Sequence, residues 1–225
     1  MDENMYRHSG SAGNSVYTLL KEQIISLELP PGTALSEKET SVRFQVSRTP
    51  VRESFVRLAQ EGLVLVFPQR GTKVSLIDTK LVEEARFMRE QLECAVIRLA
   101  CTDLSAGWLA KLEANLVQQH ESIERHEGRR MFDLDEAFHR ILFEGCGKLA
   151  TWGIMQQLNV HFNRVRMLRL DTNPYWNHLY DQHSRMVEAI RGKATDEAER
   201  IMHEHLNLGV ADLNVLREQY PEYFK

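Results

Sequence analysis

Three histidines and one aspartate have the types and spacing of a metal site. Asp135 and His139 lie four residues apart in a predicted helix, so their side chains project from one face about a turn apart. His183 and His205 lie in two later predicted helices, each among apolar neighbours. Three imidazoles and one carboxylate suit a zinc-like ion with a position left for another ligand. The spacing alone leaves open that they are ordinary hydrogen-bonded side chains.

A second group of residues has the chemistry of contact with duplex DNA. Arg48, Thr49 and Arg52 fall in the first turns of a predicted helix that follows Ser47, away from its apolar stripe. Donors in that position reach base edges and phosphates, and the arginine fork can bond guanine or clamp a phosphate. A preceding helix and a hairpin tip supply further candidates, the tip being placed for the minor groove. The predicted contacts are Lys38, Arg48, Thr49, Arg52, Arg70 and Gly71.

The elements that must position this basic group form a winged helix-turn-helix over residues 15–77. An apolar stripe predicts a helix over 16–27, Ser36 caps a short helix to about residue 44, and Ser47 caps a third that ends near Gly62. Two β-rich runs, 63–68 and 72–77, flank Gln69-Arg70-Gly71 and predict a hairpin.

The rest of the chain reads as an all-α helical bundle over residues 78–225, which makes the fold mainly α. Long amphipathic helices are predicted over 78–104, 107–126, 129–145, 149–169, 175–192 and 194–218. Residues 1–14 are polar and rich in Gly and Ser, so we expect a flexible arm that is not a signal peptide.

Charge is distributed unevenly between the two parts. Residues 1–77 hold nine Lys/Arg against eight Asp/Glu, a net charge of +1, whereas residues 78–225 hold nineteen against twenty-four, a net charge of −5. Positive charge lies with the helix-turn-helix, as phosphate contact requires. The longest apolar run, residues 63–67, is far below the roughly 20 residues of a membrane span. With three cysteines and no metal-site pair, we expect a cytoplasmic protein that contacts no membrane.

The N-terminal part resembles the GntR family of bacterial transcription regulators. The resemblance is carried by Leu35-Ser36-Glu37, Val46-Ser47-Arg48-Thr49-Pro50-Val51-Arg52-Glu53, Glu61-Gly62-Leu63-Val64 and Arg70-Gly71-Thr72-Lys73-Val74. It implies that Lys38, Arg48, Thr49 and Arg52 contact an operator, with the wing around Gly71 in the minor groove. Gln45 replaces the usual turn glycine, so either Gln45 adopts a left-handed backbone or the turn differs.

Residues 80–215 resemble the FCD effector-binding domain of the FadR subfamily. The motifs are Arg89-x-x-Leu92-Glu93, Asp135-x-x-Phe138-His139, His183 with Met186, and Ile201-Met202-x-x-His205-Leu206. The resemblance implies that Asp135, His139, His183 and His205 hold a divalent ion whose shell an effector carboxylate completes. We expect zinc first, with nickel or manganese as alternatives.

Arginines are the candidate effector contacts. Arg89 could pair with an effector carboxylate, as the resemblance implies, or with Glu93 or Asp135 as a structural ion pair. Arg164 and Arg166 could line the same pocket.

Together these patterns predict a homodimeric transcription regulator, a repressor by preference, on a palindromic operator and controlled by a small organic acid. Two alternatives stay open: a helical-bundle metalloenzyme whose Asp/His set activates water, and a regulator whose polar cluster binds a ligand without metal.

Overall fold

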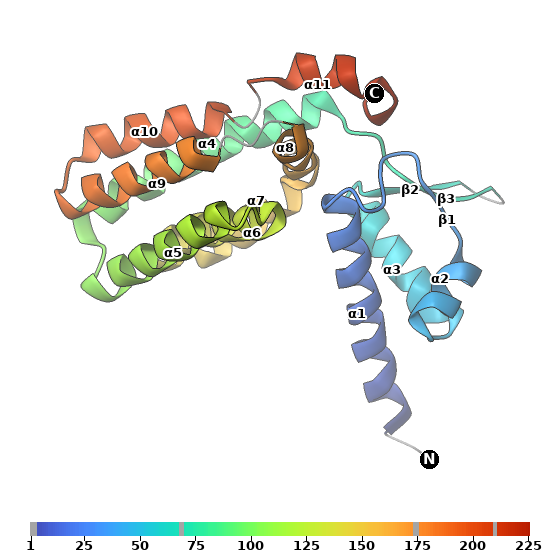
Figure 1. The fold of residues 1–225 in the computed structure, drawn as a ribbon. Helices are drawn as coiled ribbons and strands as arrows, with labels where there is room; N and C mark the ends of the chain where they lie inside the picture. The colour runs from blue at the N-terminus through green and yellow to red at the C-terminus, as the bar shows by residue number, and fades with distance from the viewer. Residues whose placement is uncertain (1–3, 68–69, 173–175, 209–210) are drawn as a thin grey trace. The chain divides into compact units, whose positions relative to one another are not determined.

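The computed structural model describes residues 4–67, 70–172, 176–208 and 211–225, with the backbone alone for 4–12 and 170–172. The chain divides into two compact units, residues 1–79 with 217–225 and residues 80–216 (Figure 1). Among the described residues, no helix combines the length and apolar character that crossing a membrane requires.

Three helices build the first unit: α1 (Asn4–Ile25), α2 (Glu37–Phe44) and α3 (Arg48–Gln60). α1 packs against α3, and both helices bury apolar side chains, among them Leu20 and Ile24 on α1 and Phe55 and Leu58 on α3. Ser36 occupies the N-cap of α2 and its hydroxyl accepts from the Glu39 amide, as the sequence predicts. Ser47 occupies the N-cap position of α3, but its side chain makes no capping hydrogen bond.

A three-stranded antiparallel sheet, in the order β1-β3-β2, completes the winged helix-turn-helix. β2 (Val64–Phe67) and β3 (Gly71–Val74) form the predicted hairpin, with Val64 opposite Val74 and Phe67 opposite Gly71. The short strand β1 (Ala34–Leu35), which the sequence did not reveal, pairs with β3. Gly71 has φ +92°, a conformation that favours glycine. Gln69, the first residue of the predicted tip, and Pro68 lie outside the described residues.

The two ends of the chain differ from expectation. α1 begins at Asn4, so most of the expected flexible arm, residues 1–14, is helical, and residues 1–3 lie outside the described part. At the other end, residues 217–225 group with the first unit and not with the helical bundle. The Ile77 amide donates to the Tyr223 carbonyl and the Lys225 amide donates to the Ile77 carbonyl, which ties the end of the chain to residue 77.

The second unit is a helical bundle, as predicted. Its helices are α4 (Thr79–Asp103), α5 (Ala106–Glu124), α6 (Gly128–Gly145), α7 (Leu149–Leu158), α8 (Val160–Thr172), α9 (Trp176–Arg191) and α10 (Thr195–Leu208). The last helix, α11 (Leu213–Gln219), begins in this unit and ends in the segment that groups with the first. α9 packs against both α10 and α5, and α5 packs against α6 (Figure 1). Phe138, Leu142, Met186, Ile201 and Met202 are buried in the shared core.

Two predicted helices are each divided in the structure. The helix expected over 149–169 is interrupted at Asn159, which ends α7 and whose carbonyl accepts from the Asn163 amide in the first turn of α8. Asparagine is a weaker helix former than leucine or methionine, which favours a boundary there. The helix expected over 194–218 is divided into α10, which ends at Leu208, and α11, which starts at Leu213, with a turn at Ala211 and Asp212. Residues 209–210 lie outside the described part. The apolar periodicity that continues beyond Leu208 hid the break.

Gln45 resolves the question raised by its sequence position. It ends α2 with φ 54° and ψ 41°, a left-handed conformation, and its amide donates to the carbonyls of Ser41 and Val42. The turn therefore keeps its geometry with a side chain where glycine is the easier residue.

We expect Gln45→Gly to stabilise the first unit by about 0.5–1 kcal/mol. Relief of a left-handed side chain gains roughly 1–2 kcal/mol, and the greater freedom of glycine in the unfolded chain takes back about 0.5–1 kcal/mol. Urea unfolding followed by circular dichroism measures the difference. Gln45→Ala keeps the Cβ atom and should give no comparable gain; a loss of stability in Gln45→Gly would contradict the argument.

Candidate metal centre and nucleic-acid interface

The first turns of α3 present polar side chains on one face and bury apolar side chains on the other. Arg48, Thr49 and Arg52 are exposed, whereas Val51 and Phe55 are buried against the rest of the first unit. The other predicted DNA contacts, Lys38 at the start of α2 and Arg70 and Gly71 at the wing, are exposed as well. All six are therefore accessible on the winged helix-turn-helix.

Arg52 is held in place by the preceding helix. Its Nε and Nη2 atoms each donate to the Glu37 carboxylate at 3.0 Å, a two-pronged contact between α3 and the first turn of α2. The Arg52 side chain is still 68% exposed, because the fork lies at the surface. An ion pair this exposed is only weakly stabilising, so a phosphate or a base can compete with Glu37 for Arg52.

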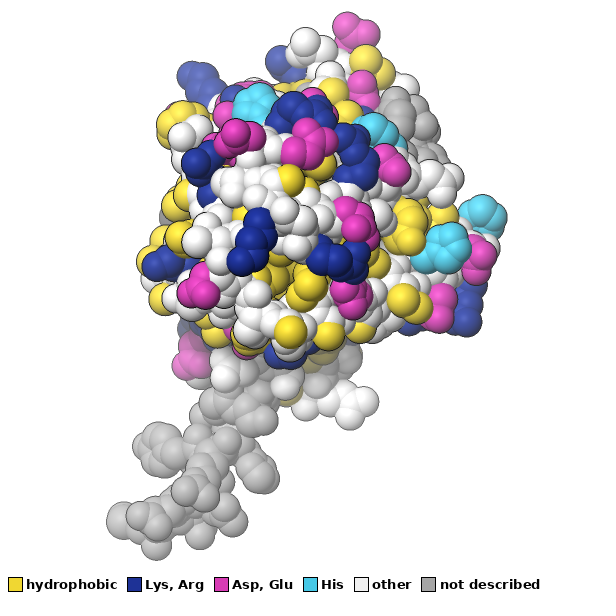
Figure 2. Space-filling view, turned by 90° about the vertical axis from the view of Figure 1, so that its left-hand side faces the viewer, with side chains coloured by type: hydrophobic (Ala, Val, Ile, Leu, Met, Phe, Trp, Pro, Cys, Tyr) yellow, Lys and Arg dark blue, Asp and Glu magenta, His cyan; other side chains and the backbone are white. Residues whose placement is uncertain are grey.

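One face of the protein carries mixed charge. On the face that Figure 2 shows, Lys and Arg side chains are interspersed with Asp and Glu. A surface that binds nucleic acid is predominantly positive over its footprint. This face therefore lacks the charge pattern of a nucleic-acid interface.

Inside the second unit, the four predicted metal ligands come together. One ligand atom from each of Asp135, His139, His183 and His205 lies within 4.8 Å of the others, and all four residues are buried. α6 supplies Asp135 and His139, α9 supplies His183, and α10 supplies His205. Residues far apart in the sequence therefore form one buried cluster.

The Nε2 atoms of the three histidines point into this cluster. His139 Nε2 lies 3.1 Å from His205 Nε2. His183 Nε2 and His205 Nε2 each lie 3.7 Å from Asp135 Oδ1, and His139 Nε2 lies 3.8 Å from Asp135 Oδ2. Each ring thus uses the same nitrogen toward the centre.

The opposite nitrogen of every ring faces a hydrogen-bond acceptor. His139 Nδ1 contacts the carboxylate of Glu93, on α4. His183 Nδ1 donates to Gln119 Oε1 of α5 at 2.9 Å, and His205 Nδ1 donates to Gln182 Oε1 at 3.0 Å. A proton on Nδ1 leaves the lone pair of Nε2 free, which is the form in which imidazole binds a metal.

A chain of amides fixes the orientation of Gln119. Asn115 Nδ2 donates to the Leu134 carbonyl at 3.0 Å, so Asn115 Oδ1 is left to accept from Gln119 Nε2 at 2.6 Å. Gln119 must then turn its oxygen toward His183, and the proton of His183 lies on Nδ1. The chain begins at the carbonyl next to Asp135, so the backbone of α6 sets the tautomer of a ring on α9.

Burial and charge set the protonation of the cluster. Burial lowers the pKa of His183 to about 3, and Asp135 only partly offsets it; burial and the two neighbouring rings lower the pKa of His205 well below its usual range. Burial alone would raise the pKa of Asp135, but Arg166 and the histidines outweigh it and hold this pKa far below its usual value. His183 and His205 are therefore neutral, and Asp135 is charged, at neutral pH.

The donor set fits a divalent ion. Asp135 Oδ1 and His183 Nε2 are buried without a hydrogen-bond partner. A buried polar atom without a partner costs free energy. A cation between them would relieve this cost, with three imidazole nitrogens and one carboxylate as ligands.

Two arginines adjoin the cluster. Arg89 Nε donates to Glu93 Oε1 at 2.5 Å and Arg89 Nη1 lies 3.6 Å from Glu136 Oε1, so Arg89 forms the structural ion pair that the sequence allowed. Arg89 Nη2 is buried without a hydrogen-bond partner and remains available to an anion. Arg166, on α8, contacts Asp135 and donates to Glu136 Oε1 at 2.5 Å.

Arg164 is buried two residues before Arg166. Burial lowers its pKa to about 10. Residues two apart on a helix point in different directions, so Arg164 and Arg166 do not share a face of α8. Of the two, Arg166 is the one that contacts Asp135. A contact between Arg164 and an effector stays a prediction.

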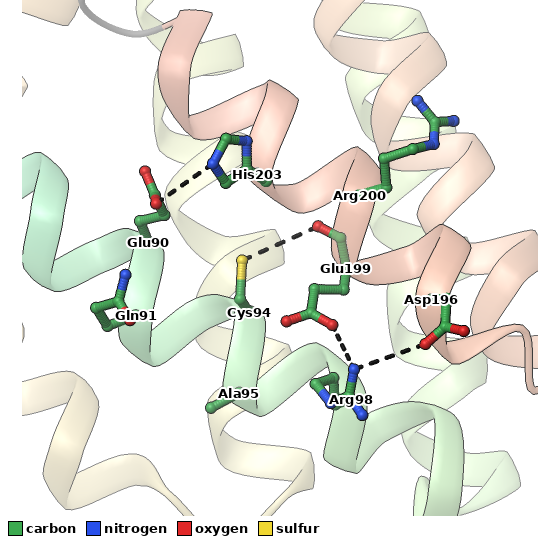
Figure 3. Close-up of a pocket in the computed structure, with 9 residues that line it drawn as sticks. All are labelled: Glu90, Gln91, Cys94, Ala95, Arg98, Asp196, Glu199, Arg200 and His203. Atoms are coloured by element: carbon green, nitrogen blue, oxygen red, sulfur yellow. Dashed lines mark hydrogen bonds and ion pairs between the residues drawn. The ribbon is translucent and has the colours of Figure 1, made fainter.

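A hollow of about 490 Å³ lies between α4 and α10 (Figure 3). Its charged groups pair across the groove: Arg98 with Glu199 and Asp196, and His203 with Glu90 at 3.3 Å. Burial raises the pKa of Cys94, at its floor, to about 11, which disfavours the reactive thiolate. Most charged groups of the hollow are already paired with one another, so it is a poorer candidate for a ligand site than the histidine cluster.

The groups that orient the three rings were not among the residues predicted from the sequence. Glu93 appeared only as a partner for Arg89, and Gln119 and Gln182 were not singled out. Gln182 directly precedes His183 on α9, so its contact with His205 on α10 depends on helix packing. Buried glutamines on predicted apolar faces were the one available signal, since such residues are buried only with partners.

Both units of the chain match known protein families. Residues 12–74 match the family described as bacterial regulatory proteins of the gntR family, and residues 84–208 match the FCD domain. The HTH-type transcriptional repressor RspR of Escherichia coli strain K12 is 36% identical over 209 residues, covering 93% of this chain and 92% of that protein. An uncharacterized HTH-type transcriptional regulator of Streptomyces ambofaciens is also 36% identical, covering 93% of this chain and 88% of its own.

Solved structures share the fold. E. coli McbR/YncC has a TM-score of 0.79 at 21% identity, covering 93% of this chain and 98% of its own. A putative GntR regulator from Rhodococcus sp. RHA1 has a TM-score of 0.76 at 21% identity. The matched families and relatives are transcription regulators, so the metalloenzyme alternative is not favoured and the chain is not an enzyme. The chain belongs to the GntR family of bacterial transcription regulators, with a winged helix-turn-helix DNA-binding domain and an FCD domain.

Proposed function

We propose that this regulator is a repressor controlled by a small carboxylate metabolite, which binds at a divalent ion inside the FCD domain. The observation that carries the proposal is the convergence of three imidazole Nε2 atoms and the Asp135 carboxylate, with each Nδ1 facing an acceptor. Ligands that are oriented in advance lose little entropy when the ion binds. The name of the relative RspR, a transcriptional repressor, supports repression as the direction of control.

Asp135, His139, His183 and His205 would hold the ion. Two of the three imidazoles have a lowered pKa, so no proton has to leave those two rings before the ion binds near neutral pH. When bound, the ion supplies a positive centre to which a carboxylate can bind. Nitrogen-rich sets of this kind accept zinc, and nickel or manganese as well.

Local charge favours an anionic effector. Glu93, Asp135 and Glu136 against Arg89 and Arg166 leave a net charge of −1, and a divalent ion changes it to +1. A buried excess of positive charge is stabilised by an anion. Arg89 Nη2, buried and without a hydrogen-bond partner, is the proposed effector contact of the chain. Arg164 is a second proposed contact, from the resemblance to the FCD domain.

DNA binding would use Lys38, Arg48, Thr49, Arg52, Arg70 and Gly71 of the winged helix-turn-helix. A homodimer would present two recognition helices to the two halves of a palindromic operator. Such a protein acts on the chromosome, which places it in the bacterial cytoplasm. Effector binding would change operator affinity by a coupling free energy of roughly 1–3 kcal/mol.

Arg52→Ala should weaken binding to the operator by about 10- to 100-fold, since loss of an arginine that contacts a base costs about 1–3 kcal/mol. An operator is first selected with the unaltered protein from fragments of the source chromosome, and affinities are then measured at fixed salt. Arg57→Ala is the matched control, because Arg57 lies in the last turn of the same helix and donates to Asn14 Oδ1. Equal affinities of the Arg52 and Arg57 variants would remove Arg52 from the interface.

The untagged protein should contain about one divalent ion per chain, and His205→Gln should lose it because one of four ligands is gone. Elemental analysis after growth in metal-replete medium measures the content. His203→Gln is the control, since His203 lies two residues earlier on α10 with an exposed side chain. Less than about a tenth of an ion per chain in the unaltered protein would leave the regulator without a metal.

A further inference from the structure

Glu93 is a buried carboxylate whose two oxygens face different partners. Oε1 accepts from Arg89 Nε at 2.5 Å, and Oε2 contacts His139 Nδ1. The side chains of Glu93 and Arg89 are each 1% exposed, and that of His139 is fully buried. Water therefore cannot take the place of either contact.

The contact with His139 sets the direction of the ring. Glu93 Oε2 lies against Nδ1, so the opposite nitrogen, Nε2, faces the cluster. A carboxylate beside Nδ1, itself held by the Arg89 guanidinium, favours a proton on Nδ1 and a lone pair on Nε2. A carboxylate behind a ligating imidazole also makes the ring a stronger ligand.

Arg89 holds Glu93 in turn. The two residues lie four apart on α4, so their side chains meet on one face. Arg89 Nη1 also lies 3.6 Å from Glu136, on the same helix as His139. The carboxylate of Glu93 is thus fixed from both ends, by a guanidinium and by an imidazole.

We propose that Glu93 is the positioning residue of the metal centre, which presents His139 to the ion and is itself anchored by Arg89. The inference rests on the proposed metal centre. A purely structural role is the competing explanation, in which Glu93 only neutralises the buried charge of Arg89. The two explanations differ in what happens when that charge is removed.

A pair of double variants separates them. Arg89→Met with Glu93→Gln and Arg89→Met with Glu93→Leu both remove the two buried charges together, which avoids the unpaired charge that a single substitution would leave. The glutamine keeps an oxygen that can accept from His139 Nδ1, as Gln119 does for His183. The leucine offers no acceptor. Only a positioning role makes the two variants differ in metal affinity.

Zinc affinity is measured by competition with a chromophoric chelator on metal-free full-length protein, alongside the urea midpoint of each metal-free variant. We expect the leucine variant to bind zinc about 10- to 100-fold more weakly than the glutamine variant, the range for loss of a group that orients a ligand. Equal zinc affinities would overturn the inference, whatever the midpoints.

Two further outcomes are decisive. If the unaltered protein binds none of zinc, nickel or manganese, the proposed metal centre and this inference both fail; if it binds the ion and the two variants agree in affinity for it, the inference alone fails. Should the leucine variant not fold, nitrogen NMR of the histidine rings in the unaltered metal-free protein takes its place. A His139 proton on Nδ1 supports the inference, and a proton on Nε2 overturns it.

Discussion

The FCD domain of this protein depends on the outer contact of each buried histidine. Glu93, Gln119 and Gln182 each lie against the Nδ1 atom of one ring, from α4, α5 and α9. These contacts keep the rings from rotating, so that each Nε2 faces the cluster. The free energy for orienting the rings is therefore provided when the bundle folds, and helices that carry no ligand, α4 and α5, become part of the site.

The same constraint explains why so much charge is tolerated in this core. Each buried carboxylate lies beside a guanidinium, with Glu93 on Arg89 and Asp135 on Arg166, and each pair also touches a histidine. Buried ion pairs of this kind contribute little net stability, since desolvation offsets attraction. Their more important effect is on geometry, because each charged group restricts the positions open to its neighbours. Any ligand that takes one arginine from its carboxylate must then disturb the ring behind that carboxylate.

The sequence predicted the parts of this structure that depend on local pattern and on residue type. Asp135 and His139 could be paired from their spacing on one helix, and Ser36 and Gly71 stand where a cap and a left-handed turn require them. The helix breaks at Asn159 and after Leu208 were not predicted, because apolar periodicity continues across both. Gln182 and Glu93 escaped for a different reason: their roles depend on which helices lie side by side, and no spacing within one helix encodes that.

In the DNA-binding domain, too, an acidic side chain orients a functional side chain, but there the contact is exposed to solvent. Glu37 holds Arg52 from the neighbouring helix, much as Glu93 holds His139, yet the fork lies in solvent and is only weakly stabilising there. A phosphate or a base can compete for Arg52 at small cost, whereas nothing in solvent competes for His139. Buried contacts of this kind favour permanent orientation and exposed ones favour exchange. Glu93 thus keeps His139 in one orientation permanently, as a metal ligand requires. Glu37 orients Arg52 only until a phosphate or a base takes its place.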